Sequence, residues 1–328
     1  MVNVVAEAGQ CMMGSVDVAI DMAQRAKRAG AWGFKVQLLT PHKIATQDAA
    51  LYWTDDLGTK NQREAFTKAG LIDYGAWGAV KQACDDIGIE FLATPFDLDA
   101  LEALEEIGVG VYKIASGDIT YRPLLERVNE TAKPVLLSTG ASNAADIIDA
   151  LGWLQDCQVT LLACTLSYPT PNHAAHLSRI HTLRRYSDKV GYSDHTTGIM
   201  AALAAAAMGA EVLEKHYTLD NQGPDVPDHK MALEPSALAE YVRLAEIGAA
   251  LRGRPELQCV PEEIRARQGA RRGVYASRDI PEGHRIEFGD LAFLRPANNM
   301  SPSDYYLLVG SRSPGFRAGE SLEPLVRV

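Results

Sequence analysis

The sequence contains few of the features that mark a secreted, membrane-spanning or nucleic-acid-binding protein. Its five cysteines are odd in number and form no CxxC pair, which argues against a disulfide framework and a zinc knuckle. No apolar run reaches the roughly 18 residues that a membrane span needs, and the segment from Met1 to Glu7 lacks the basic region of a signal peptide. Acidic residues outnumber basic ones, with a formal net charge of −10, so no general surface for nucleic acid or an anionic membrane is expected. We therefore expect a soluble, cytoplasmic protein with reduced thiols.

What the sequence does contain is an alternation of short β-rich runs with longer amphipathic segments. A length of 328 residues suits a barrel of about 250 residues with an appendage, and 47% hydrophobic residues suffice for a large core. Eight runs have the composition of strands: Val2–Ala8, Gly33–Gln37, Glu90–Thr94, Val111–Ala115, Pro134–Ser138, Thr160–Thr165, Val190–Ser193 and Glu211–His216. No glycine-rich dinucleotide fingerprint follows the first run. We therefore predict an α/β fold that closes into a (β/α)8 TIM barrel, in preference to an open doubly wound sheet.

The helical segments and the C-terminal part of the chain complete the expected organisation. Helical spacing is found over Val16–Ala29, Tyr74–Ile87, Leu98–Ile107, Ala144–Leu154, Ile199–Met208 and Ser236–Leu251. The connection from Leu38 to Leu71 is unusually long and is typical of a binding loop or lid. Beyond the last helix, a stretch rich in Arg, Glu and Pro precedes short β-like runs separated by turn signals. We expect a catalytic barrel over residues 1–252, a linker over 253–270 and a small β-rich domain over 271–328.

Polar residues stand at or just past the C-terminal end of every predicted strand. They are Glu7, Lys35 and Gln37, Thr94 and Asp97, Lys113 and Ser116, Ser138 and Thr139, Thr165 to Tyr168, Ser193 to His195, and Glu214 to His216. Barrel enzymes build their active sites at this end of the strands, whereas the strand middles fill an apolar core. One polar residue at a strand end usually has a structural role. Because every predicted strand carries polar residues at this end, we predict an active site there.

Two of these residues, His195 and His216, form the clearest candidate metal site because they end consecutive strands. Neighbouring strands lie about 4.8 Å apart, so both imidazoles can reach one divalent ion and leave positions open for water and substrate oxygens. The alternative is that each is a hydrogen-bonded histidine at the barrel rim. The pairing of the two favours the metal.

Lys35 and Lys113 predict an anion site near the ends of the second and fourth strands. An unpaired lysine is costly to bury there, so two converging lysines suggest a phosphate or carboxylate ligand. Two turns add hydroxyls and approachable backbone N–H groups: Ser116-Gly117-Asp118 and Ser138-Thr139-Gly140. The alternative is that the lysines are paired with Glu7 or Glu214.

These residues fall within a series of motifs that runs nearly from end to end of the chain. The series is Ala6-Glu7-Ala8-Gly9, Phe34-Lys35-Val36-Gln37, Ala93-Thr94-Pro95-Phe96-Asp97, Tyr112-Lys113-Ile114-Ala115-Ser116-Gly117-Asp118-Ile119, Leu137-Ser138-Thr139-Gly140, Tyr168-Pro169-Thr170-Pro171, Gly191-Tyr192-Ser193-Asp194-His195-Thr196 and Glu214-Lys215-His216-Tyr217-Thr218. In this order it resembles the sialic acid synthase family, the phosphoenolpyruvate-dependent synthases of nonulosonic acids. The tail, from Ala276 through Leu294-Arg295-Pro296 to Pro302, resembles the antifreeze-like (SAF) domain that ends these synthases.

The resemblance implies a reaction and the residues that carry it. C3 of phosphoenolpyruvate attacks the aldehyde of an open-chain amino sugar, water adds at C2, and phosphate leaves by C–O cleavage to give a 3-deoxy-2-keto acid. A divalent metal, Mn²⁺ or Mg²⁺, polarises the aldehyde. The implied metal ligands are His195 and His216, and the implied phosphoenolpyruvate site is Lys35, Thr94, Lys113, Ser116 and Ser138. The residues implied around the sugar and the reaction centre are Gln37, Phe96 and Tyr168, with Glu7 and Asp228 as catalytic groups beside the histidines.

The resemblance also implies a partner subunit. Arg295 matches the arginine that the tail domain of one subunit inserts into the barrel of the other, where it contacts the sugar. A domain-swapped homodimer is therefore expected. This role explains why a domain of only about 55 residues, marginal alone by its size, is retained.

The sequence departs from the family where polar groups are expected. The family has Asn-His-x-Gly after the first strand, whereas this chain has Cys11-Met12-Met13-Gly14. Ala163 replaces a usual His, and Leu166 replaces a usual Asn or Ser. The loop after the eighth strand offers Asp225 or Asp228 as its acid, and we prefer Asp228 from its spacing to the motif that follows. These losses predict a more apolar sugar pocket and an acceptor less hydroxylated than N-acetylmannosamine.

Two other functions are compatible with parts of this pattern. One is a different metal-dependent barrel aldolase or isomerase, which would leave the lysines and the Ser-Gly and Thr-Gly turns without a role. The other is a sugar- or anion-binding protein derived from a synthase and without turnover, which the lost polar groups favour. Retention of both histidines, Glu7 and Arg295 counts against the second.

Overall fold

The computed structural model describes residues 2–53, 58–220, 227–298 and 300–323. The chain divides into two compact units, Met1–Gly253 and Arg254–Val328. The stretch expected as a linker therefore falls largely within the second unit. In the described part of the chain, no helix has both the length and the apolar character needed to cross a bilayer.

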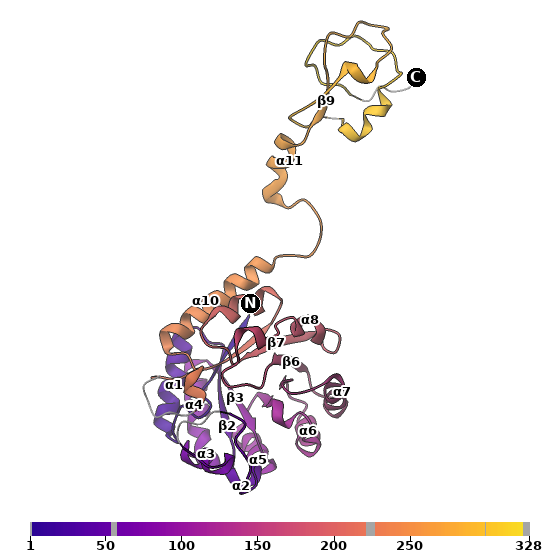
Figure 1. Cartoon of the computed structure of the whole chain (residues 1–328). Coiled ribbons are helices and arrows are strands. Elements are labelled where there is room, and N and C mark those ends of the chain that lie inside the picture. Colours follow the sequence, from indigo (N-terminus) through magenta and orange to yellow (C-terminus); the bar gives the residue numbers. More distant parts are fainter. Residues whose placement is uncertain (1, 54–57, 221–226, 299, 324–328) are drawn as a thin grey trace. The chain divides into compact units, whose positions relative to one another are not determined.

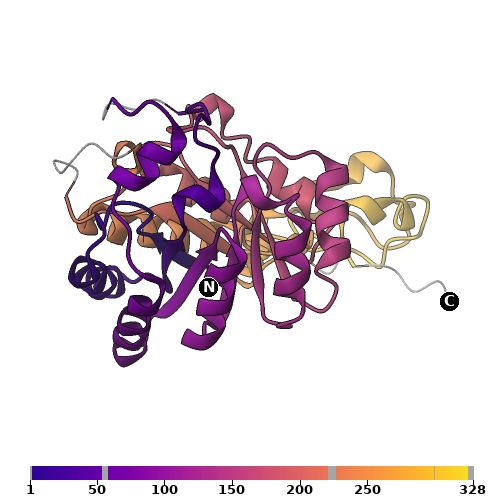
Figure 2. The same cartoon turned by 90° about the horizontal axis from the view of Figure 1, so that it is seen from below.

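The first unit is a closed barrel of eight parallel strands in sequence order, as predicted. The strands are β1 (Asn3–Glu7), β2 (Gly33–Leu38), β3 (Glu90–Pro95), β4 (Val111–Ile114), β5 (Val135–Ser138), β6 (Val159–Cys164), β7 (Lys189–Asp194) and β8 (Val212–His216). Strand β1 pairs in parallel with both β2 and β8, which closes the ring. Figures 1 and 2 show the helices of this unit arranged around the outside of the strands.

Helices follow the strands and cover the barrel. They are α1 (Val16–Arg28), α2 (Pro41–Ile44), α3 (Gln62–Lys68), α4 (Trp77–Ile87), α5 (Leu98–Ile107), α6 (Arg122–Asn129), α7 (Ala144–Trp153), α8 (Arg179–Leu183), α9 (Met200–Ala207) and α10 (Pro235–Arg252). Four of them begin at a residue whose side chain accepts a backbone N–H of the first turn: Ser15, Asn61, Asp97 and Asn143. The long connection from Leu38 to Leu71 contains α2 and α3.

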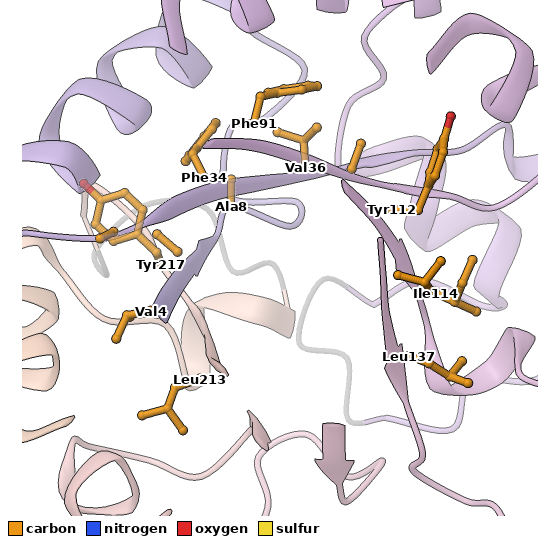
Figure 3. Packing of buried hydrophobic residues seen from close by; sticks show 14 of the residues in the cluster. Val4, Ala8, Phe34, Val36, Phe91, Tyr112, Ile114, Leu137, Leu213 and Tyr217 are labelled. Atoms are coloured by element: carbon orange, nitrogen blue, oxygen red, sulfur yellow. The ribbon is translucent and has the colours of Figure 1, made fainter. Parts of the chain in front are cut away.

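Side chains alternate between the two faces of each strand, so the barrel has an outer and an inner apolar layer. Figure 3 shows Phe34, Phe91 and Tyr112 on the helix-facing side of the strands, within the large cluster that joins strands and helices. A separate cluster comes from five strands that surround the barrel axis: Val5, Leu92, Leu136, Leu162 and Val212. Only the interior of the barrel brings these residues together. They form an apolar floor beneath the C-terminal ends of the strands.

The second unit is a small domain with its own core. It contains α11 (Ile264–Ala270) and an antiparallel pair, β9 (Gly273–Ala276) and β10 (Leu291–Leu294). Its core residues are Val274, Ala276, Ile280, Ile286, Leu291, Met300, Leu308 and Leu322. The buried carboxylate of Asp290 accepts hydrogen bonds from Arg278 Nε at 2.8 Å and the Glu287 N–H at 2.9 Å, which ties the turns to β10.

Candidate active site

A cavity of about 330 Å³ lies at the C-terminal ends of the barrel strands. Every site residue predicted in the barrel lines this main cavity: Glu7, Lys35, Gln37, Thr94, Phe96, Lys113, Ser116, Ser138, Tyr168, His195, His216 and Asp228. Arg295 belongs to the second unit, where it directly follows β10 and is exposed. Asp225 lies outside the described residues, whereas Asp228 belongs to a 3-10 turn over Pro227–Lys230.

The period of two along each strand explains why these side chains converge. In β8, Val212 belongs to the inner floor, and Glu214 and His216 follow on the same face and line the main cavity. The residues between them face outward. Lys215 Nζ lies 3.3 Å from Asp194 Oδ2, and this pair is completely buried outside the main cavity.

Two lysines and two carboxylates form the centre of the main cavity. Lys35 Nζ lies 2.7 Å from Glu7 Oε2 and 3.6 Å from Glu214 Oε2. Lys113 Nζ lies 3.8 Å from Glu214 Oε1. The alternative in which the lysines are paired with Glu7 or Glu214 therefore describes this structure. Both ammonium groups also border the cavity, so an anion can bind beside these carboxylates.

Burial and charge separate the pKa values of the two carboxylates. Burial raises the pKa of Glu7 to about 7 although Lys35 opposes the shift. Burial acts on Glu214 in the same direction, but Lys113 and Lys35 lower its pKa to about 2. Glu7 Oε1 also accepts a hydrogen bond from Gln37 Nε2 at 2.8 Å. Near neutral pH Glu214 is ionised, whereas Glu7 exchanges its proton readily, as a general acid or base must.

Hydroxyl groups extend this cluster into an anion-binding corner. The Gly140 N–H donates to Ser116 Oγ at 3.0 Å. A side chain at Gly140 would place its first carbon 2.8 Å from that oxygen, so only glycine allows the approach. Ser138 Oγ is buried and has no hydrogen-bond partner among the described residues. Because an unpaired buried hydroxyl is costly, a phosphate or carboxylate oxygen at this corner would satisfy it.

The imidazole rings of His195 and His216 lie with their centroids 5.4 Å apart. His195 Nδ1 is 3.1 Å from the Thr165 carbonyl oxygen, and donation to that oxygen leaves Nε2 with a lone pair. Burial lowers the pKa of His216 and favours its neutral ring. His216 Nδ1 has no hydrogen-bond partner in the described ranges and lies 3.6 Å from Asp228 Oδ2.

Imidazole is the commonest metal ligand in proteins, and both rings border the main cavity. No group of three or more His, Cys, Asp or Glu side chains within the described residues meets the geometry of a metal site. An ion on the two imidazoles would therefore keep positions for water and substrate oxygens. The site fits the predicted divalent metal through its two rings and the unpartnered His216 Nδ1.

The structure gives a place in the site to polar residues that the sequence named without assigning them a role there. Ser193 Oγ donates to Glu214 Oε1 at 2.8 Å, and both residues line the main cavity. Their sequence signal was their position two residues before His195 and His216, which places them on the same strand face. Asp118 also lines the cavity, burial raises its pKa to about 6, and its Oδ2 has no partner among the described residues.

The connection between β2 and α4 lays an apolar wall against the main cavity. The rings of Tyr52 and Trp53 pack edge to face, with their centroids 4.6 Å apart. The centroid of Trp53 lies 5.8 Å from that of Phe66 of α3, and the centroid of Tyr52 lies 6.4 Å from that of Tyr168. Tyr52, Trp53 and Phe66 all line the cavity, together with Ile44. Their spacing in the sequence has no helix or strand period, so no pattern singled them out.

Only part of the predicted loss of polar groups falls on the main cavity. Leu166 lines it, as expected. Ala163 does not, because it lies on the outer face of β6 within the core that faces the helices. Cys11 does not line it either, because its thiol is buried beside Thr218 and Asp228. Met12 lines a smaller neighbouring cavity. The apolar character of the main cavity comes instead from the wall around Tyr52.

A closed parallel barrel that gathers acid–base carboxylates, lysines and imidazoles around one cavity at its C-terminal end has the architecture of a TIM-barrel enzyme. Residues 22–255 match the model of the NeuB family, and residues 271–316 match that of the SAF domain. The chain therefore belongs to the NeuB family, the class of sugar-acid synthases that the sequence resembled.

Individual relatives agree with this assignment. The chain is 33% identical over 316 residues to N,N'-diacetyllegionaminic acid synthase from Campylobacter jejuni, a match that covers 94% of each chain. It is 29% identical over 332 residues to human N-acetylneuraminate-9-phosphate synthase, covering 94% of this chain and 88% of that protein. The crystal structure of N-acetylneuraminic acid synthetase from Leptospira borgpetersenii matches with a TM-score of 0.73 at 32% identity, covering 81% of this chain and 90% of that one.

Proposed function

We propose that the protein condenses phosphoenolpyruvate with an aldose to give a 3-deoxy-2-keto sugar acid and phosphate. The observation that carries the proposal is the main cavity, where the anion-binding corner around Lys113 and Ser138 adjoins the pair His195 and His216. The first part suits phosphate and carboxylate groups, and the second suits an aldehyde oxygen that gains negative charge. Relatives named as legionaminic and neuraminic acid synthases support this class of reaction.

Phosphoenolpyruvate binds at the lysine cluster in this proposal. Lys35 and Lys113 neutralise its charges, while the hydroxyls of Ser116 and Ser138 donate to its oxygens. The free Ser138 Oγ gains its missing hydrogen bond on binding. Glu214 holds both lysines in place before the substrate arrives.

The chemical step needs one proton donor and one proton acceptor. As C3 of phosphoenolpyruvate bonds to the aldehyde carbon, the aldehyde oxygen takes a proton from Glu7, whose pKa of about 7 keeps a protonated fraction at neutral pH. Water then adds at C2 and returns a proton to Glu7. Phosphate leaves with the bridging oxygen, so the new keto oxygen derives from water.

Mn²⁺ or Mg²⁺ would be held by His195 and His216, and when bound it polarises the aldehyde as a Lewis acid. Asp228 positions His216, because its Oδ2 accepts a hydrogen bond from the Gln10 N–H at 3.0 Å and lies beside the ring. The Thr165 carbonyl holds His195 in the same way. We therefore expect Asp228→Asn to weaken metal affinity more than affinity for phosphoenolpyruvate.

The acceptor in this proposal is an amino sugar less hydroxylated than N-acetylmannosamine. The support is the wall of Tyr52, Trp53, Phe66 and Leu166, whose side chains are mostly carbon and offer hydroxyl groups only the Tyr52 O–H and the Trp53 N–H. The experiment is the rate of phosphate release with a panel of aldoses that differ in hydroxyl content. Deoxygenated amino sugars should react best. A clear preference for N-acetylmannosamine would sink this part of the proposal.

The active form in this proposal is a domain-swapped homodimer. The support is the match of Leu294-Arg295-Pro296 to the family motif and the exposure of Arg295 on a unit with its own core. Arg295 from one subunit would complete the sugar site of its partner. An exposed guanidinium suits contact with sugar oxygens, because its five donors are held in a fixed plane.

A further inference from the structure

A second, smaller cavity adjoins the main cavity and takes no part in the steps above. It measures about 30 Å³ and lies between the segment after β1, the end of β2 and the turn that leads from α3 to α4. We call it the side chamber. Gln10, Gln37 and Phe66 line both spaces, so the two cavities meet at these three side chains.

The side chamber is lined mostly by apolar side chains, with polar atoms contributing about as much of its exposed surface. Met12, Leu39, Ala69 and Ile72 contribute carbon and sulfur to it, and no charged side chain among the described residues borders it. The apolar side chains favour contact with a methyl group, and the polar atoms favour a polar group beside it. The free space exceeds the roughly 10–15 Å³ that one water-sized group needs. The chamber therefore suits a small substituent that combines a methyl group with a polar atom.

One polar atom at the side chamber lacks a partner. Trp77 borders it and is 2% exposed, and its Nε1 has no hydrogen-bond partner among the described residues. An indole N–H can only donate, so the group that satisfies it must carry an acceptor. Gln37 does not satisfy it, since no hydrogen bond within the described part of the chain reaches Trp77 Nε1 and Gln37 Nε2 donates to Glu7 Oε1. An acceptor oxygen next to a methyl group is the arrangement found in a short acyl group.

A close backbone contact holds the walls of the side chamber. A side chain at Gly70 would place its first carbon 2.7 Å from the Met13 carbonyl carbon and 2.8 Å from Gly14 N, so the two turns meet backbone to backbone. Met12 directly precedes one turn, and Ala69 directly precedes the other. The distance between these two side chains is therefore set by the fold.

We propose that the side chamber receives the methyl end of a short acyl group on the acceptor sugar, an inference that rests on the proposed condensation. The Trp77 N–H donates to the acyl oxygen. Met12 and Ala69 limit the length of the acyl chain, because they lie on opposite turns that cannot separate without breaking the contact at Gly70. They are specificity-determining residues and take no part in the chemistry.

The test uses variants that change the volume of the side chamber in opposite directions. Met12→Ala enlarges it and Ala69→Val reduces it. Met22→Ala is the matched control, because Met22 of α1 is equally buried and borders neither cavity. The kcat/KM is measured for acceptors that carry formyl, acetyl or propanoyl at the same nitrogen. The ratio of kcat/KM between two acceptors, measured on one preparation of a variant, does not depend on the fraction of that variant that is folded.

We expect the wild type and Met22→Ala to prefer acetyl, Met12→Ala to prefer propanoyl and Ala69→Val to prefer formyl. Each carbon added to or removed from the acyl group should change the kcat/KM ratio between two acceptors roughly ten-fold or more. The KM for phosphoenolpyruvate should stay unchanged. Phosphate release with ratios that stay the same in both chamber variants would overturn the inference and leave the condensation standing.

Calorimetry with the alditols that correspond to these acceptors tests the side chamber separately from the proposed function. An alditol has no aldehyde, so it reports binding without reaction. Their affinities should follow the same order in each variant, whether or not turnover occurs. A shifted order without phosphate release from any acceptor would uphold the side chamber and reject the condensation. An unshifted order would overturn the side chamber.

Discussion

Glu214 faces both lysines of the main cavity, and the two ammonium groups keep its carboxylate ionised. Removing one partner of a buried ion pair costs roughly 3–5 kcal/mol. We expect Glu214→Ala to lower the free energy of unfolding by this order. Phosphoenolpyruvate should restore part of the loss, because its negative groups take the place of the carboxylate beside Lys35 and Lys113. Thermal unfolding with and without the ligand measures both effects.

Asp194→Ala is the matched control for this prediction. It breaks an equally buried pair, with Lys215, that lies outside the main cavity. A comparable loss of stability is expected, with no added rescue by phosphoenolpyruvate beyond that of the wild type. The same ligand-induced shift in both variants would argue against an anion site at the lysines.

Asp118 gives the stability of the barrel a dependence on pH. Burial raises its pKa from 3.8 to about 6, so the folded protein keeps a proton that the unfolded chain has lost over this window. The free energy of unfolding is therefore highest below about pH 4 as far as Asp118 is concerned. It falls as the pH rises through about 6, by at most about 3 kcal/mol. We expect Asp118→Asn to equal the wild type near pH 4 and to exceed it at neutral pH. Urea unfolding at both pH values decides this, and a difference that does not change with pH would contradict it.

The position of a single side chain was predictable from the sequence where the period of two along its strand was clear. Glu7, Lys113 and His216 lie at or next to the ends of strands on the inward face, and the structure places them in one cavity. Lys215 stands next to His216 and is just as polar, but the period of two turns it outward. Ala163 was assigned to the sugar pocket through the family motif alone. Its place on the outer face of β6 follows from the same period.

At the scale of elements, long periodic segments were predicted well and short ones were not. All the strands of the barrel were found, as were α1 and α5, which have a helical period and a side-chain cap, and α10, which is long. Helices α2, α3, α6 and α8 of the barrel were missed, because each spans little more than two turns at most and shows little of a helical repeat. The side chamber was not predictable either, because it depends on two turns meeting backbone to backbone.

Close packing between strands leaves little room for a side chain at Gly191 of the barrel. The first side-chain carbon at Gly191 of β7 would lie 2.6 Å from Leu162 Cδ2 of β6 and would also collide with the Val212 carbonyl oxygen. Gly78 of α4 has nothing within 4 Å of the same position. We expect Gly191→Ala to destabilise the fold by about 1–3 kcal/mol and Gly78→Ala to stabilise it by about 0.5–1 kcal/mol. Urea unfolding measures both, and a neutral Gly191→Ala would show that the strands can move apart.

At the scale of the whole molecule, the barrel and the small domain each have a core of their own. The sequence indicated both, because composition changes after the last barrel helix. How two chains share a site cannot be seen in one sequence, since it depends on surfaces that meet only in the assembly. The domain-swapped dimer is therefore a proposal with its own test.

Mixed dimers provide that test. His195→Ala removes a group from the barrel, and Arg295→Ala removes one from the small domain, so each variant alone should be inactive or nearly so. In a swapped heterodimer, one barrel with an intact His195 receives Arg295 from the other chain. Mixing equal amounts under exchange should therefore recover about a quarter of wild-type activity. No recovery, from dimers shown to have exchanged, would mean that Arg295 serves its own barrel or neither.

The central claim is tested most directly by phosphate release from phosphoenolpyruvate labelled with ¹⁸O at the bridging oxygen. Wild type and His195→Ala are compared with Mn²⁺, with a chelator, and with the panel of aldoses. We predict release that requires both metal and aldose, that carries the label into phosphate and that His195→Ala abolishes. Release of unlabelled phosphate would contradict the account because it reports P–O cleavage. No release from folded wild type with any aldose would contradict it as well.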